Sequence, residues 1–282
     1  MCRLGLAFGF AVCLLGLVGG WLSLPAWAGG APGQRVHPRI ALIIDDLGNQ
    51  KSAGERALAL PGPVTYAFLP HTPFAWRQAS RAHAIKRQVM LHLPMESDEG
   101  NRLGAGALTL TMGRKAFLHT LGDDLDSVPY VEGINNHMGS LLTRDPTAMR
   151  WLMASIRETG LFFIDSRTTR RTVAAKVAKR NLIPTASRNV FLDNRPERRA
   201  ILSQLDKLIE MARQQGKAIG IGHPYPQTLS VLEQEIPRLT EKGIELVPVS
   251  KLIDRGNILW HASSSPLPRA AKNSKQSPSP IY

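Results

Sequence analysis

Acidic and histidine residues stand directly after several short apolar runs of this 282-residue sequence. Asp45 and Asp46 follow the first run, and His92 and His137 follow later ones. Two adjacent carboxylates repel each other near an apolar core unless a cation or a hydrogen-bond donor compensates their charge. One carboxylate and two neutral imidazoles form a site that suits Zn, Mn, Fe, Co or Ni, and the second aspartate is then free to act as a base.

Further polar residues stand at comparable positions: His71, Asp165, Asp193 and His223. Each has an ordinary structural interpretation, because aspartate often caps a helix and histidine is often hydrogen-bonded in a core. For Asp165 and Asp193 taken alone, we favour that interpretation. The joint occurrence of five such residues favours an active site instead. These five are Asp45, Asp46, His92, His137 and His223.

Several other chemistries lack the residues they need. Both cysteines, Cys2 and Cys13, precede the folded part, which excludes disulfides, cysteine zinc sites and thiol nucleophiles there. The sequence has no Gly-x-Ser-x-Gly, Gly-x4-Gly-Lys or His-Glu-x-x-His motif, and the glycines of segment 103–107 lack the third glycine of a dinucleotide loop. We therefore expect neither a serine hydrolase nor a nucleotide-binding protein.

The order of elements predicts an α/β fold. Short apolar runs alternate with helical patterns seven or eight times, which indicates parallel strands joined by helices in a barrel or an open doubly wound sheet. We favour a distorted (β/α) barrel of seven or eight parallel strands, whose carboxyl ends meet on one face and bring the polar residues together. The predicted strands are 40–44, 64–69, 88–91, 131–134, 161–164, 189–192, 218–221 and 244–249.

Three of the predicted helices carry end signals. Asp145 and Pro146 predict the start of one that ends at Gly160, and Gly216 predicts the end of another with an apolar face from Ile201 to Ala212. Pro237 predicts a bend in the helix that opens at Thr228 and ends at Gly243.

The two ends of the chain differ from the middle. Residues 4–18 are apolar apart from glycines, and Pro25 precedes Ala26-Trp27-Ala28, which predicts a signal peptide over 1–28 cleaved near Ala28, with an uncleaved N-terminal membrane anchor as the alternative. We expect a polar leader over 29–38, a folded domain over 39–260 and a disordered basic tail over 261–282. The chain is then exported to the periplasm or the extracellular envelope.

The formal net charge is +13, with a pI near 10.3. In an exported protein this charge suggests attraction to an acidic envelope polymer or to lipid headgroups more than to nucleic acid, and plain solubility is the alternative.

Seven ordered motifs between Ile40 and Ile253 resemble the divergent polysaccharide deacetylases, a branch of the NodB-like carbohydrate esterases. They are IALIIDDLG (40–48), VTYAFLPHT (64–72), QVMLHLPME (88–96), GINNHMGS (133–140), FFIDSRT (162–168), RNVFLDN (188–194) and GIGHPYPQT (220–228). The resemblance implies a distorted (β/α) barrel that removes acetyl groups from N-acetylglucosamine polymers with a divalent metal. It further implies that Asp45 is the general base, Asp46 and His92 are metal ligands, and His223 is the general acid.

Two motifs depart from the parent family. The parent has a second metal histidine four residues after the first, where this sequence has Glu96, which could ligate, hydrogen-bond a ligand or do neither. The parent's Arg-x-Pro-Tyr stretch is replaced by segment 135–139, in which His137 restores the missing imidazole and Asn136 lies beside it.

The sequence therefore predicts an exported hydrolase that uses a divalent metal, preferably Zn, to remove acyl groups, most simply N-acetyl, from an envelope carbohydrate. Asp45 takes the proton of water and His223 protonates the leaving amine, while Arg188 or Asp165 orients the two. Asp193 and Tyr225 complete the expected surroundings of the site. The alternative is a non-catalytic carbohydrate-binding or scaffold protein on the same barrel.

Overall fold

A computed structural model of the protein describes residues 37–98, 100 and 102–253. The expected signal peptide 1–28, nearly all of the leader 29–38 and the tail 261–282 lie outside the described residues. No helix within the described part of the chain is long and apolar enough to span a membrane.

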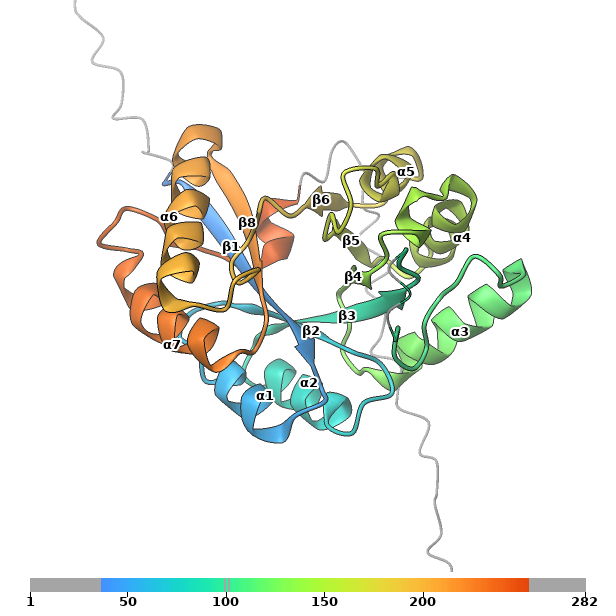
Figure 1. Ribbon diagram of the computed structural model, residues 1–282, viewed down its shortest axis with the longest axis horizontal. Helices are drawn as coiled ribbons and strands as arrows, with labels where there is room; N and C mark the ends of the chain where they lie inside the picture. The colour runs from blue at the N-terminus through green and yellow to red at the C-terminus, as the bar shows by residue number, and fades with distance from the viewer. Residues whose placement is uncertain (1–36, 99, 101, 254–282) are drawn as a thin grey trace, which may run out of the picture. The chain divides into compact units, whose positions relative to one another are not determined.

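The described residues form nine parallel strands with helices between them (Figure 1). The strands are β1 Arg39–Leu47, β2 Thr65–Phe68, β3 Gln88–Met95, β4 Gly133–Met138, β5 Phe162–Asp165, β6 Thr185–Ser187, β7 Val190–Phe191, β8 Lys217–Gly222 and β9 Glu245–Leu246. The α-helices are α1 Lys51–Leu58, α2 Ala75–Ala84, α3 Arg114–Ser127, α4 Pro146–Arg157, α5 Ala174–Arg180, α6 Arg198–Gln215 and α7 Pro226–Glu235. Three short 3-10 helices are η1 Leu142–Arg144, η2 Ile236–Arg238 and η3 Val249–Leu252.

The sheet is a distorted and incomplete barrel, which confirms the predicted fold class. The strand order is β6-β5-β4-β3-β2-β1-β8-β7, with β9 paired to β1 outside this path. Eight strands therefore follow one another, and within the described residues no pairing joins β6 to β7 across the remaining gap. All carboxyl ends open on one face, because every pair is parallel.

Alternate residues of each strand pack on opposite sides of the sheet. In β1, Ile40, Leu42 and Ile44 belong to the core that contacts the helices. Ala41 and Ile43 belong to a second apolar cluster of strand residues and the segment Val247–Ile253, which contains no residue of α1 to α7. This second cluster therefore fills the inside of the barrel, and the next inward position of β1 is Asp45.

Each of the eight predicted strand segments contains part of an observed strand. Three helix signals act as expected, those at Asp145, Gly216 and Pro237, but α4 ends at Arg157, before Gly160, and α7 begins at Pro226 and ends at Glu235 instead of running from Thr228 to Gly243. Asp145 caps α4 by accepting hydrogen bonds from the backbone nitrogens of Thr147 and Ala148, and Gly216 ends α6 with a φ of 78°. At Pro237 the helix changes to the 3-10 segment η2, because proline supplies no amide proton to an α-helical hydrogen bond. Strand β6 has only three residues, too few for a detectable apolar run, and was not predicted.

Candidate metal and catalytic site

Strand β1 carries the two adjacent carboxylates on an irregular stretch of backbone at its carboxyl end. On a regular strand Asp45 and Asp46 would point to opposite sides of the sheet. The pairing of β1 with β2 shifts register between Ile44 and Leu47, and Asp46 has a φ of 57°. A bulge of this kind bends the strand and redirects a side chain. Both carboxylates consequently approach His92 Nε2, Asp46 to 3.2 Å and Asp45 to 3.6 Å.

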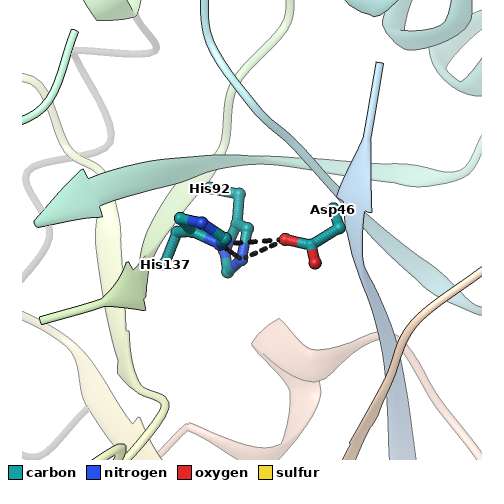
Figure 2. Close-up of side chains that lie close together, drawn as sticks. All are labelled: Asp46, His92 and His137. Atoms are coloured by element: carbon teal, nitrogen blue, oxygen red, sulfur yellow. Dashed lines mark hydrogen bonds and ion pairs between the residues drawn. The ribbon is translucent and has the colours of Figure 1, made fainter. Parts of the chain in front are cut away.

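Asp46, His92 and His137 converge from three strands, β1, β3 and β4 (Figure 2). Asp46 Oδ1 lies 3.2 Å from His92 Nε2 and 2.9 Å from His137 Nδ1. The two imidazole nitrogens are 3.1 Å apart. Three potential donor atoms thus form a nearly equilateral triangle, with His92 buried and the other two residues partly exposed.

The triangle fits a shared divalent cation. Asp46 Oδ1 is buried and accepts no hydrogen bond within the described part of the chain, although two imidazole nitrogens lie beside it. Donors bound at about 2.1 Å in neighbouring positions of an octahedral or tetrahedral shell lie roughly 3.0 to 3.4 Å apart. The observed separations of 2.9 to 3.2 Å agree with this spacing. A carboxylate and two imidazoles suit Zn, Mn, Fe, Co or Ni.

Asn135 joins the buried histidine to the second carboxylate, a role that the sequence analysis did not assign. The register of β3 and β4 places Asn135 opposite His92. Asn135 Nδ2 donates to both oxygens of Asp45, at 2.8 and 3.0 Å, so Asn135 Oδ1 accepts the proton of His92 Nδ1 at 2.9 Å. In the neutral ring this arrangement places the proton on Nδ1 and leaves Nε2, which faces Asp46, free to bind a metal, which is the tautomer that a metal ligand requires.

His223 is held by Asp193, which follows β7. Asp193 Oδ1 accepts from His223 Nδ1 at 2.9 Å, and Asp193 Oδ2 accepts from the backbone nitrogen of His223 at 2.6 Å and from Thr228 Oγ1 at 2.8 Å. The other ring nitrogen, Nε2, then lies 3.9 Å from Asp46 Oδ2. Burial acts to lower the pKa of His223, but the hydrogen bond and charge of Asp193, with the charges of Asp46 and Asp45, raise this pKa to about 9.

The adjacent aspartates have different acidities. Burial acts to raise the pKa of Asp46, but His137 and His92 outweigh it and hold this pKa well below its usual range. Burial raises the pKa of Asp45 above its ordinary value, against the opposing effects of His92, His223 and Asn135. Asp46 is therefore suited to ligation and Asp45 is the more basic of the two.

Glu96 does not join the triangle. Its Oε2 accepts from the backbone nitrogen of Leu110 at 2.6 Å, and its backbone oxygen accepts from Leu141 and Leu142. Glu96 therefore holds the segment after β3 in place. It is neither a member of the triangle nor a hydrogen-bond partner of Asp46, His92 or His137. His137 supplies the second imidazole.

Two residues expected to orient Asp45 and His223 have other partners. Asp165 accepts from Thr172 Oγ1 at 3.0 Å and from the backbone nitrogen of Arg167 at 2.9 Å. Arg188 donates to the backbone oxygen of Ser166 at 2.6 Å and lies over the ring of Phe191. Both side chains therefore stabilise the segments after β5 and β6. The contacts that orient Asp45 and His223 come from Asn135 and Asp193 instead.

Asn136 links neighbouring strand ends. Its Oδ1 accepts from the backbone nitrogen of Ser166, and its Nδ2 donates to the backbone oxygen of Met138. It thus supports the β4 segment that carries His137 and lies outside the triangle.

A cleft of about 590 Å³ opens beside the triangle. Its lining includes Asp46, His137, His223 and Tyr225. The side chain of Tyr225 is an exposed aromatic group, and its ring centroid lies 5.6 Å from that of His223. A flat ring at this place offers a surface for the apolar face of a sugar.

Comparison with known proteins agrees with this architecture. Residues 42–253 match the family model described as "divergent polysaccharide deacetylase". Uncharacterised proteins of Haemophilus influenzae and Escherichia coli are 34% and 32% identical over 77% and 91% of this chain, and over 77% and 76% of their own lengths. The crystal structure of an uncharacterised protein from Agrobacterium tumefaciens superposes with a TM-score of 0.74 at 25% identity, covering 77% of this chain and 89% of that one. The chain belongs to the divergent polysaccharide deacetylase family.

Proposed function

We propose that this protein is a metal-dependent hydrolase that removes acyl groups, N-acetyl in the first instance, from a carbohydrate of the cell envelope. The observation that carries the proposal is the convergence of Asp46, His92 and His137 beside two oriented proton-transfer groups. A divalent cation in this triangle, Zn in preference to Mn, Fe, Co or Ni, would polarise the acyl oxygen and lower the pKa of water. Family membership supports an acylated carbohydrate as the substrate.

The protein's own residues then move the protons. Asp45, held by the Asn135 amide, accepts the proton of the attacking water, and its elevated pKa makes it a stronger base than an ordinary aspartate. His223 donates its proton to the leaving amine, and a pKa of about 9 keeps the ring protonated at neutral pH. Tyr225 contacts the sugar beside the reacting group.

The rival function is a non-catalytic carbohydrate-binding or scaffold protein. One observation favours it: Asp45 is only 1% exposed and does not line the cleft. A base this deeply buried needs a water molecule brought directly against it.

Acetate release from N-acetylated chitooligosaccharides and peptidoglycan fragments distinguishes the two functions. We expect the purified protein to release acetate, to stop after chelation and to recover when a divalent metal returns. Glycan binding without acetate release under any metal would favour the scaffold protein.

Export to the periplasm or extracellular envelope is part of the proposal and is supported by the sequence of segment 1–28. The net charge of +13 supports an additional affinity for acidic envelope polymers.

Asp193→Asn tests the assignment of His223 as the acid. Without the carboxylate, burial dominates and the pKa of His223 falls, because Asp193 supplies the main stabilisation of the charged ring. We expect the alkaline limb of the pH–rate profile to move to lower pH, with bound metal unchanged. A limb that stays in place would remove His223 from the role of proton donor.

A further inference from the structure

A second aspartate–histidine pair lies on the wall of the same cleft. His71 Nε2 is 2.8 Å from Asp124 Oδ1. The side chain of Asp124, on α3, is completely buried, whereas that of His71 is 36% exposed and lines the cleft together with Asp46 and His137. The reaction proposed above uses neither His71 nor Asp124.

The position of His71 is fixed by the backbone around it. His71 follows β2 with a φ of 54°, a conformation that non-glycine residues adopt at a cost. Its backbone nitrogen donates to Ser127 Oγ at 3.3 Å, and Ser127 Oγ donates to the backbone oxygen of Asp124 at 2.7 Å. These contacts hold the histidine against α3.

The segment that carries His71 is also tied to the strand that carries Asp46. The backbone nitrogen of Leu69 donates to Leu47, and that of Phe74 donates to Gly48, both at 2.9 Å. Gly48 has a φ of 111°, and a Cβ there would meet Thr72 Oγ1 at 2.1 Å. The two segments are therefore in close contact, and His71 keeps a constant place relative to the metal triangle.

The pair leaves one imidazole nitrogen available to a ligand in the cleft. Burial, with the charge of Asp123, raises the pKa of Asp124 to about 8. The 2.8 Å contact with Asp124 occupies Nε2 of His71, which leaves Nδ1 as the ring nitrogen available to a ligand. Within the described residues Nδ1 has no hydrogen-bond partner. An imidazole nitrogen at a fixed position can recognise a hydroxyl group of a ligand, as hydrogen-bond donor or as acceptor.

We propose that His71 binds substrate through a hydrogen bond between Nδ1 and a hydroxyl group of the sugar next to the one that reacts, and that Asp124 positions it. The inference rests on the proposed function in taking an acylated glycan as the occupant of the cleft. A volume of about 590 Å³ suits a ligand larger than one acyl group. His71 lines the same cleft as Asp46 and His137, and within the described residues its ring is paired with Asp124 instead of with the triangle, so we assign it to the neighbouring sugar instead of to the acyl group.

The test is the binding of an N-acetylglucosamine tetramer to the purified chain, measured by calorimetry with and without metal. His71→Asn removes the ring and keeps a residue that tolerates positive φ. We expect about tenfold weaker binding, a KM for the tetramer that rises more than kcat falls, and unchanged metal content. Asp124→Asn, which preserves the volume of the buried side chain, should weaken binding in the same direction but less.

The matched control is His119→Asn. His119 pairs with Asp123 at 2.9 Å on the exposed side of the same helix, so its replacement should leave tetramer binding unchanged. Wild-type affinity in His71→Asn, or a wild-type chain that does not bind the tetramer, would overturn the inference. If the wild type binds but releases no acetate, the proposed function fails while weaker binding in His71→Asn still supports the role of His71.

Discussion

Replacing His92 or His137 with alanine should remove most of the bound metal and abolish measurable acetate release. Each side chain supplies one of three donors in the triangle, at 3.2 and 2.9 Å from Asp46 Oδ1. The replacement of residues that merely support ligands typically costs 10- to 100-fold in affinity, so the loss of a ligand should cost at least about 100-fold. Metal analysis after dialysis against a known free metal concentration measures the effect.

Asn135→Ala provides an intermediate case. It removes the acceptor for His92 Nδ1 but leaves all three donors, so metal affinity should fall by about 10- to 100-fold. His119→Ala is the control, because this exposed histidine lies on α3 and pairs with Asp123. Wild-type metal content in both His92→Ala and His137→Ala would show that the triangle is not a metal site.

The site residues that point into the barrel can be predicted from the two-residue period of the strands. On three strands an apolar residue that points into the barrel is followed, two positions later, by a polar residue of the site. These pairs are Ile43 and Asp45, Met90 and His92, and Ile221 and His223. Because parallel strands end on one face, the sequence was sufficient to predict a convergence of these residues. The same period would have identified Asn135, which lies two residues before His137 and opposite His92.

Other parts of the site depend on features that no sequence period reveals. The redirection of Asp46 requires the register shift in β1 and a positive φ, both of which arise from pairing with β2. The role of Glu96 depends on the approach of Leu110, fourteen residues along the chain. Asp165 is the last residue of β5 and Asp193 lies two residues after β7, yet only Asp193 faces a histidine. Contacts between residues far apart in the sequence decide the roles of these side chains, and a local sequence pattern does not contain that information.

Asp45→Asn should lower the rate of acetate release by about 10²- to 10⁴-fold and leave the metal in place. Asparagine has nearly the same shape as aspartate but accepts a proton far less readily. The side chain is not one of the three donors, since its nearer oxygen lies 3.6 Å from His92 Nε2. The Asn135 amide can still donate to the remaining carbonyl oxygen, so the geometry of His92 should persist.

Asp165→Asn is the matched control for this prediction. Asp165 is another buried aspartate at a strand end, 2% exposed, but its carboxylate accepts from Thr172 and Arg167 instead of from Asn135. Its replacement should affect the melting temperature more than the rate. Equal rate losses in the two variants would assign Asp45 a general role in stability, whereas a loss confined to Asp45→Asn at unchanged metal content identifies it as the base. The charge of Asp45 also contributes to the raised pKa of His223, so the alkaline limb of the pH–rate profile must be compared in the same variant. A loss of rate with the metal retained and this limb unmoved assigns Asp45 to the proton of water.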